Sequence, residues 1–380
     1  MKKRIWQGRA LIEGKFREDQ VLVCEDGQFT YVGPRRAGDQ PDTVFETGCL
    51  VPGYLDLHVH GLHGADVMDG TMEALETISR GLATYGVTGF LATTLTGDLE
   101  HLVGVLRTCA EFAGRQPVGA QLLGVHLEGP WINLRYKGAQ NEAHVIRPLL
   151  HDAKRLVEAG QGLLKLVTLA PEHPEAAEVI AYLSQQGVRV SVGHSDATFD
   201  EVTGAMAHGL DHVTHCCNAM RGLHHREPGV VGAALYHDEL TAELIADGVH
   251  VHPAVMNILY KVKGQERLVL VSDGMRAVGM ADGEYDLGGQ NVHMVGGEAR
   301  LADGTLAGST LTLDRAVRNM VELGHAPLAE AVTMASATPA SVLGLQGRKG
   351  QLAVGQDADF LWLDEDMQVG KVYIGGESLS

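Results

Sequence analysis

The sequence predicts an α/β protein: a (β/α)8 TIM-like barrel with a small β-sandwich domain formed by the N- and C-terminal segments. In the middle of the chain, short β-rich runs alternate with longer segments of helical periodicity, which implies a parallel sheet. Eight such runs fall within about 220 residues, the number of strands that closes a barrel. Both ends of the chain are instead β-rich and broken by turn residues.

The central runs are short and apolar, and most of them end in a polar residue. They are Tyr54–His60, Val87–Thr94, Gln121–Glu128, Leu164–Ala170, Val188–His194, Asp211–His215, Ala242–Asp247 and Arg267–Asp273. Helices are predicted between most of them, at Met72–Tyr85, Leu99–Ala113, Leu149–Ala159, Glu175–Gln186, Phe199–His208 and Pro253–Val262. A doubly wound open sheet shows the same alternation, so periodicity alone leaves both architectures open.

The segments before and after the eight central runs are predicted to form further strands and helices. Strands are predicted near the N-terminus at Arg9–Glu13, Gln20–Cys24 and Phe29–Val32. After the eighth run come Gly-rich hairpins (Tyr285–Ala302), helices at Leu311–Glu322, Leu328–Ala335 and Pro339–Leu343, and short strands within Gln351–Gly376. We therefore expect residues 1–50 and 347–380 to form the small sandwich, and residues 51–346 to form the barrel.

Composition narrows the class of protein. Hydrophobic residues make up 45% of the chain, enough for a large core, and no apolar run reaches the length of a membrane span. The formal net charge of −18 disfavours a nucleic-acid binder, so we expect neither a nucleic-acid nor a membrane partner. The five cysteines contain no CxxC pair, and no apolar segment follows the basic start, so a reducing, cytoplasmic location is expected.

Polar residues recur where the apolar runs stop. The first run ends in His58-Val59-His60, and residues two apart in a strand point to the same face. The later runs end in Glu128, His194, His215 and Asp273. A single histidine at a strand end is more often structural than ligating, so the argument depends on agreement among five strand ends. Because catalytic groups gather at the carboxyl ends of barrel strands, these nitrogen and oxygen donors suit zinc or ferrous iron.

A cation at this rim would polarise an acyl oxygen and lower the pKa of a bound water to roughly 7. Asp273 would then take a proton from that water and later deliver it to the leaving amine. A thiolate nucleophile is the alternative, because Cys216 and Cys217 follow a candidate ligand. Neither cysteine has an evident basic partner in the sequence, which favours buried structural cysteines.

A second polar group follows His215. The loop there carries Arg221, Arg226 and neighbouring histidines, and arginine suits bidentate contact with phosphate. An ordinary surface arginine paired to an acid fits this feature as well. His250 follows the seventh run and is suited to a sugar hydroxyl or a phosphate.

Taken together, the motifs resemble the amidohydrolase superfamily. Pro52–Gly61 resembles its first-strand motif, and His126–Trp131 resembles the third-strand motif of the N-acetylglucosamine-6-phosphate deacetylase family, where Glu replaces the carboxylated Lys of related hydrolases. Later motifs follow in the same order, at Gly193–Ser195, Thr214–Met220, Arg226–Gly229, Asp247–His250, Ser272–Gly274 and Gly355–Phe360. The resemblance covers almost the whole chain.

This resemblance implies one or two divalent metal ions per subunit, with zinc expected first and iron, cobalt or manganese as alternatives. It assigns Glu128, His194 and His215 to the principal ion. It assigns His58 and His60 to a second ion, with Glu128 bridging and Asp273 nearby as ligand, general base and general acid. It assigns to a sugar phosphate Ala139, Gln140, Asn218, Ala219, Arg226, His250, Leu306, Ala307 and Gly308. It also implies a homodimer in which the phosphate-binding arginine reaches the neighbouring subunit.

The implied activity is metal-dependent hydrolysis of N-acetylglucosamine 6-phosphate to glucosamine 6-phosphate and acetate, in amino-sugar catabolism. N-acetylgalactosamine 6-phosphate, or another N-acyl amino-sugar phosphate, would use the same residues, and the sequence does not decode the difference. A non-catalytic amidohydrolase-like scaffold predicts missing metal ligands, whereas all six candidates are present here. Some family members have His where this chain has Gln140, which leaves that contact open.

Overall fold

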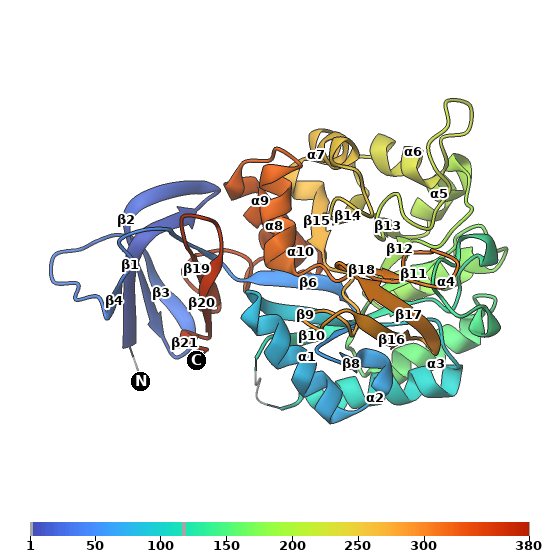
Figure 1. Cartoon of the computed structure of the whole chain (residues 1–380), viewed down its shortest axis with the longest axis horizontal. Coiled ribbons are helices and arrows are strands. Elements are labelled where there is room, and N and C mark those ends of the chain that lie inside the picture. Colours follow the sequence, from blue (N-terminus) through green and yellow to red (C-terminus); the bar gives the residue numbers. More distant parts are fainter. Residues whose placement is uncertain (1–2, 116–118, 380) are drawn as a thin grey trace.

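The computed structural model describes residues 3–115 and 119–379 of the chain. Figure 1 shows a barrel surrounded by helices, with both ends of the chain lying together in a separate β-rich unit at one side. The barrel strands form one parallel sheet of eight in sequence order, from β6 to β15. They are β6 (Tyr54–Val59), β9 (Val87–Thr94), β10 (Gln121–Glu128), β11 (Leu164–Leu169), β12 (Arg189–Val192), β13 (Leu210–Val213), β14 (Thr241–Ile245) and β15 (Leu268–Val271).

Backbone hydrogen bonds just beyond β15 close this sheet. The Asp273 N–H donates to the His58 carbonyl (2.8 Å), and the His60 N–H donates to the Gly274 carbonyl (2.8 Å). The last strand thus meets the first, which rules out an open sheet. The predicted (β/α)8 barrel is confirmed, and closure occurs at the rim that carries the candidate ligands.

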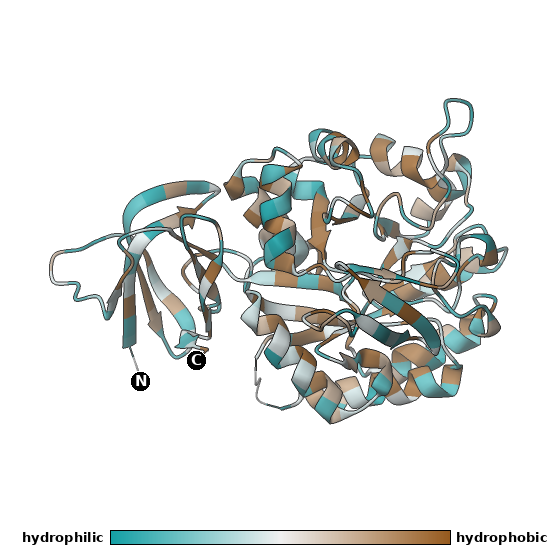
Figure 2. Cartoon of the chain, in the orientation of Figure 1, coloured by the Kyte–Doolittle hydropathy of each residue, from teal (hydrophilic) through white to brown (hydrophobic). Residues whose placement is uncertain are grey.

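Helices follow the strands and cover the outside of the barrel. They are α1 (Met72–Thr84), α2 (Leu99–Ala113), α3 (Leu150–Gly160), α4 (Ala176–Gln185), α5 (Phe199–Met206), α6 (Gly229–Tyr236), α7 (Pro253–Arg267), α8 (Leu313–Glu322), α9 (Leu328–Ala335) and α10 (Ala337–Val342). Figure 2 shows hydrophilic and hydrophobic residues alternating around α1 and α2, whereas α6 is largely hydrophobic. Without a polar face, α6 carries no helical period, which explains why the sequence did not predict it.

The strands of the two chain ends form one mixed sheet, ordered β21-β20-β19-β5-β1-β2-β3 with β4 beside β1. They are β1 (Lys3–Ile12), β2 (Lys15–Glu25), β3 (Gln28–Pro34), β4 (Thr43–Val44), β5 (Cys49–Pro52), β19 (Phe360–Leu363), β20 (Val369–Ile374) and β21 (Glu377–Ser378). The antiparallel pair of β5 and β19 joins the termini, as predicted. The sheet folds over an aromatic core, in which the Trp6 and Phe360 ring centroids lie 4.9 Å apart.

A three-stranded antiparallel sheet lies between β15 and α8, where Gly-rich hairpins were predicted. Its strands are β16 (Gly283–Leu287), β17 (Gln290–Val295) and β18 (Glu298–Arg300). Leu287, Val292 and Met294 from this sheet pack against Leu95 and Met275 of the barrel. The small sheet therefore adds a wall beside the carboxyl rim. Within residues 3–115 and 119–379, no helix is both long and apolar enough to cross a membrane.

A buried ion pair ties the C-terminal segment together. Lys349 is 3% exposed, and its Nζ lies 3.0 Å from Asp357 Oδ2 and 2.5 Å from Asp359 Oδ2. The other Asp359 oxygen accepts the Gly375 N–H at 2.8 Å. Asp357 and Asp359 lie in the C-terminal motif that the sequence singled out, and its acidic residues therefore have a structural role here.

Replacing Lys349 by Met should lower the free energy of unfolding by about 3–5 kcal/mol, because the buried Asp359 carboxylate loses its cation and the partly buried Asp357 loses one of two. Urea unfolding measures the loss. The matched control is Arg348→Met: Arg348 also pairs with Asp357, but its side chain is 55% exposed. That change should cost less than about 1 kcal/mol. Equal losses in the two variants would contradict a role for burial.

Candidate metal centre

Three candidate ligands sit at sharp left-handed turns of the backbone. His194, His215 and Asp273 have φ angles of 49°, 29° and 50°. Strands β12, β13 and β15 end two residues before them, at Val192, Val213 and Val271. The predicted strands ran on to the ligands and were two residues too long, because a positive φ is incompatible with a strand. Strained backbone of this kind is concentrated at functional sites.

The turns bring Glu128, His194 and His215 together. Glu128 Oε1 lies 3.1 Å from the Nε2 atom of each histidine, and the two Nε2 atoms lie 3.1 Å apart. All three residues are at most 5% exposed. The carboxyl end of β10 therefore meets the loops after β12 and β13 at one point, as the sequence predicted.

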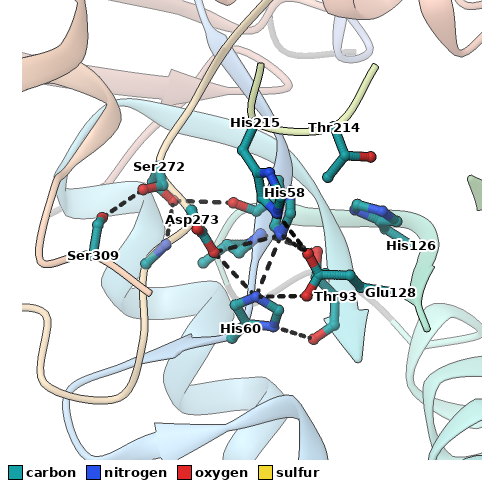
Figure 3. A network of polar contacts seen from close by, with 12 residues as sticks. His58, His60, Thr93, His126, Glu128, Thr214, His215, Ser272, Asp273 and Ser309 are labelled. Atoms are coloured by element: carbon teal, nitrogen blue, oxygen red, sulfur yellow. Dashed lines mark hydrogen bonds and ion pairs between the residues drawn. The ribbon is translucent and has the colours of Figure 1, made fainter. Parts of the chain in front are cut away.

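His58, His60 and Asp273 form a second group on the other side of Glu128, and Figure 3 shows their side chains converging. The Nε2 atoms of His58 and His60 lie 3.3 Å apart. Asp273 Oδ1 is 3.1 Å from His60 Nε2 and 3.4 Å from His58 Nε2. Glu128 Oε1 is 3.4 Å from His58 Nε2, and Glu128 Oε2 is 3.6 Å from His60 Nε2, so Glu128 faces both groups.

The hydrogen bonds of the rings fit a cation between these atoms. His194 Nδ1 lies 2.9 Å from the Tyr136 carbonyl, and His60 Nδ1 lies 3.1 Å from the Thr93 carbonyl. A carbonyl only accepts, so each Nδ1 carries a proton, and Nε2 is the ring atom of each histidine that can bind a cation. Lone pairs facing one another and Glu128 repel unless a cation lies among them. Nitrogens bound tetrahedrally to zinc at about 2.0–2.1 Å would lie about 3.3–3.4 Å apart, close to the spacings found here.

The pKa shifts of His58 and Glu128 also indicate a pocket that favours positive charge. Burial lowers the pKa of His58, but the carboxylates of Asp273, Glu128 and Glu243 outweigh burial and raise it to about 10. Burial raises the pKa of Glu128, yet the imidazoles of His58 and His194 hold it well below its usual value. The pocket thus keeps its carboxylates ionised and attracts positive charge, which either protons or metal ions can supply.

Two contacts to the ligands were not foreseen in the sequence. Glu243, fully buried in β14, lies 3.0 Å from His58 Nδ1 through Oε2. The one feature of the sequence that marks Glu243 is that an acidic residue stands in the middle of an apolar run. Gln140 accepts the Thr96 N–H at 2.7 Å and donates to Glu128 Oε2. The amide that was predicted to touch substrate therefore also orients a metal ligand.

A cavity of about 610 Å³ opens over the two groups. Of the residues predicted to bind the sugar phosphate, seven line it: Ala139, Gln140, Asn218, Ala219, His250, Leu306 and Gly308. Ala307 is fully buried behind this lining. Arg226 is exposed, and its guanidinium lies 2.8 Å from His225 Nε2, outside the cavity of its own chain.

Other basic residues near the cavity have acidic partners. Arg135, Lys137 and Arg300 line the cavity although the sequence analysis did not single them out. Arg300 pairs with Glu298 at 2.6 Å, and Arg135 with Asp196 at 3.1 Å. Arg221 pairs with the same Asp196, at 2.9 Å, as expected of an ordinary paired arginine.

In the described structure the side chains of the two neighbouring cysteines contact each other, and the nearby Lys263 ammonium donates to the Ala234 and His237 carbonyls rather than to a thiol. Cys216 is fully buried and Cys217 partly so, and their Sγ atoms lie 4.0 Å apart. Burial and the adjacent thiol raise the pKa of Cys216. Cys216 is therefore held as a neutral thiol, which argues against a thiolate nucleophile at that position.

Comparisons with known proteins agree with this geometry. Residues 49–379 match the amidohydrolase family. An N-acetylgalactosamine-6-phosphate deacetylase of Escherichia coli O157:H7 is 42% identical over 98% of both chains. An N-acetylglucosamine-6-phosphate deacetylase of Vibrio furnissii is 40% identical over 98% of this chain and 94% of its own.

Solved structures show the same fold. A mutant N-acetyl-D-glucosamine-6-phosphate deacetylase of Mycobacterium smegmatis, in complex with N-acetyl-D-glucosamine-6-phosphate, superposes with a TM-score of 0.95 at 33% identity, covering 100% of this chain and 99% of its own. The corresponding enzyme of Thermotoga maritima has a TM-score of 0.89 at 35% identity, covering 98% and 99%. Fold, ligand geometry and sequence match together show that this chain belongs to the amidohydrolase family.

Proposed function

We propose that this chain hydrolyses N-acetylglucosamine 6-phosphate to glucosamine 6-phosphate and acetate. The observation that carries the proposal is the convergence of Glu128, His194 and His215 beneath a cavity large enough for a sugar phosphate. The similarity to proteins named for this activity covers nearly the whole chain. A deacetylase of the galacto epimer is similar at 42% identity, which makes N-acetylgalactosamine 6-phosphate the second candidate substrate.

The residues proposed for the metal ions follow the geometry. Glu128, His194 and His215 would hold the principal divalent cation, and His58 and His60 a second one, with Glu128 between them and Asp273 beside them. Imidazole and carboxylate donors favour zinc, and they also suit iron, cobalt or manganese. Residues 51–346 would carry this chemistry, with residues 1–50 and 347–380 as a supporting domain.

When bound, the cation supplies Lewis-acid chemistry: it polarises the acyl oxygen and makes a nearby water more acidic. Asp273 is the group of this chain that moves the proton. Burial raises its pKa, but His58, His60 and His215 lower the pKa below its usual value, so its carboxylate is ionised and able to accept. Asp273 takes a proton from the attacking water and returns it to the amide nitrogen, which leaves as an amine while the acyl group leaves as acetate.

The substrate phosphate needs a cation, and the basic residues that line the cavity in one chain, Arg135, Lys137 and Arg300, already pair with carboxylates. We propose that a second copy supplies Arg226, in a homodimer formed through the segment between β13 and β14. Two large apolar side chains in that segment are exposed, Leu223 at 61% and Tyr236 at 73%. We further propose a cytoplasmic location, where the free cysteines stay reduced.

Purified protein should release acetate from N-acetylglucosamine 6-phosphate, and a chelator should abolish the release until zinc is restored. The same assay with N-acetylgalactosamine 6-phosphate compares kcat/KM for the two epimers. A higher value for the gluco epimer is expected. A preference for the galacto epimer would replace the first substrate by the second, and no release from either would overturn the activity.

Asp273→Asn should lower kcat by about 10²- to 10⁴-fold, because the amide cannot shuttle a proton. Elemental analysis should show that this variant still carries the principal ion. Asp366→Asn, in an exposed turn of the tail, is the matched control and should keep full activity. Near-normal turnover by the Asp273 variant would refute the proton-transfer role.

The homodimer is tested by sedimentation velocity, which should give twice the mass of one chain. Leu223→Asp and Tyr236→Asp should shift the protein toward monomer and raise KM for the phosphorylated substrate, since Arg226 would then be lost from the neighbouring cavity. A wild-type monomer with full activity would contradict the proposal.

A further inference from the structure

Glu243 is a buried charge with three donors around it. It lies in the middle of β14 and is 0% exposed. Its carboxylate is 3.0 Å from His58 Nδ1, 3.2 Å from His212 Nε2 and 3.1 Å from the backbone N–H of His215. An isolated carboxylate in a barrel interior would be strongly unfavourable, so these bonds explain how the charge is tolerated.

Two of these bonds reach opposite halves of the candidate metal centre. His58 belongs to the group with His60 and Asp273, whereas His215 belongs to the group with Glu128 and His194. A single Glu243 oxygen, Oε2, accepts from both. The two halves therefore share one acceptor oxygen of Glu243, in addition to Glu128 between them.

The contact with His58 decides which ring nitrogen faces the centre. The carboxylate accepts, so Nδ1 carries the proton and the Nε2 lone pair points toward Glu128 and Asp273. The negative charge also makes the imidazole a stronger donor to a cation. Among the described contacts of His58 Nδ1, Glu243 is the acceptor.

The contacts near His215 hold its turn. His215 has a φ of 29°, a conformation that costs free energy unless its surroundings fix it. The Glu243 side chain accepts the His215 N–H, and the Glu243 carbonyl accepts the next N–H, that of Cys216, at 2.8 Å. One residue of β14 thus holds the two peptide groups that flank His215.

We propose that Glu243 is a positioning residue that couples the two halves of the metal centre and sets the affinity of the second cation through His58. This inference rests on the proposed metal site. If Glu243 only stabilised the barrel interior, for example through its contact with His212, its replacement would leave cation binding unchanged.

Glu243→Gln tests the proposal, because Gln keeps the shape and one acceptor oxygen but removes the charge. Metal-depleted protein is titrated with zinc against a chromophoric chelator. The second ion should bind about 10- to 100-fold more weakly than in wild type, while the first ion stays within a few-fold. His212→Gln is the matched control: among the described contacts its side chain pairs with Glu243 and with none of the proposed ligands, so both affinities should be unchanged.

A double-mutant cycle with His58→Gln identifies the route. If Glu243 acts through His58, adding Glu243→Gln to the His58 variant should weaken the second ion by less than about threefold. An equal loss in both backgrounds, or no loss in the single variant, would overturn the proposal. Cobalt(II) loading gives a spectroscopic readout: the visible absorption of the second ion should change in Glu243→Gln and not in His212→Gln.

Failure of the proposed metal site is distinguishable, because wild type would then bind no ion in the same titration. Should Glu243→Gln fold poorly, Glu243→Asp serves instead. Its carboxylate keeps the charge but is one methylene short of His58 Nδ1, so it should also weaken the second ion. Wild-type affinity in a folded Glu243→Asp variant would count against the proposal.

Discussion

The structure depends on three buried carboxylates of the barrel, which belong to Glu128, Glu243 and Asp273. Each faces at least one imidazole, and together they raise the pKa of His58 to about 10 although burial opposes the shift. Concentrated negative charge in a low-dielectric interior must be balanced by positive charge. The hydrogen bonds on Nδ1 of His60 and His194 direct the Nε2 atoms to the centre, an arrangement that suits a divalent cation as the balancing charge.

The fold and the centre depend on each other. The bonds that close the barrel join His58 to Asp273 and His60 to Gly274, so closure also brings together candidate ligands from the ends of the first and last strands. The left-handed turn at His215 is held by β14, and its side chain meets Glu128 from β10. Strain at the turns is tolerated because the surrounding barrel holds them. The sheet formed by the two chain ends lies beside the barrel, away from the candidate metal centre.

Much of this could be read from the sequence, because it is carried by local patterns. The eight strands, the closed barrel and the convergence of the six candidate ligands follow from short apolar runs that end in His, Glu or Asp. The left-handed turns were not predicted from the sequence. The strands predicted to end at His194, His215 and Asp273 were too long, because these residue types do not by themselves indicate a positive φ. Glu243 was missed because its partners are distant in sequence, and α6 because an apolar helix has no period. Contributions of a second copy, as proposed for Arg226, leave no mark on the pattern of one chain.

The central claim is that imidazoles and carboxylates surround a divalent cation at this rim. X-ray absorption spectroscopy of the zinc-loaded protein tests it most directly, because it reports the atoms bound to the ion. The account predicts nitrogen and oxygen neighbours at about 2.0–2.2 Å and a histidine multiple-scattering signal. Sulfur neighbours at about 2.3 Å, which only Cys216 or Cys217 could supply beside these ligands, or no retained metal, would contradict it.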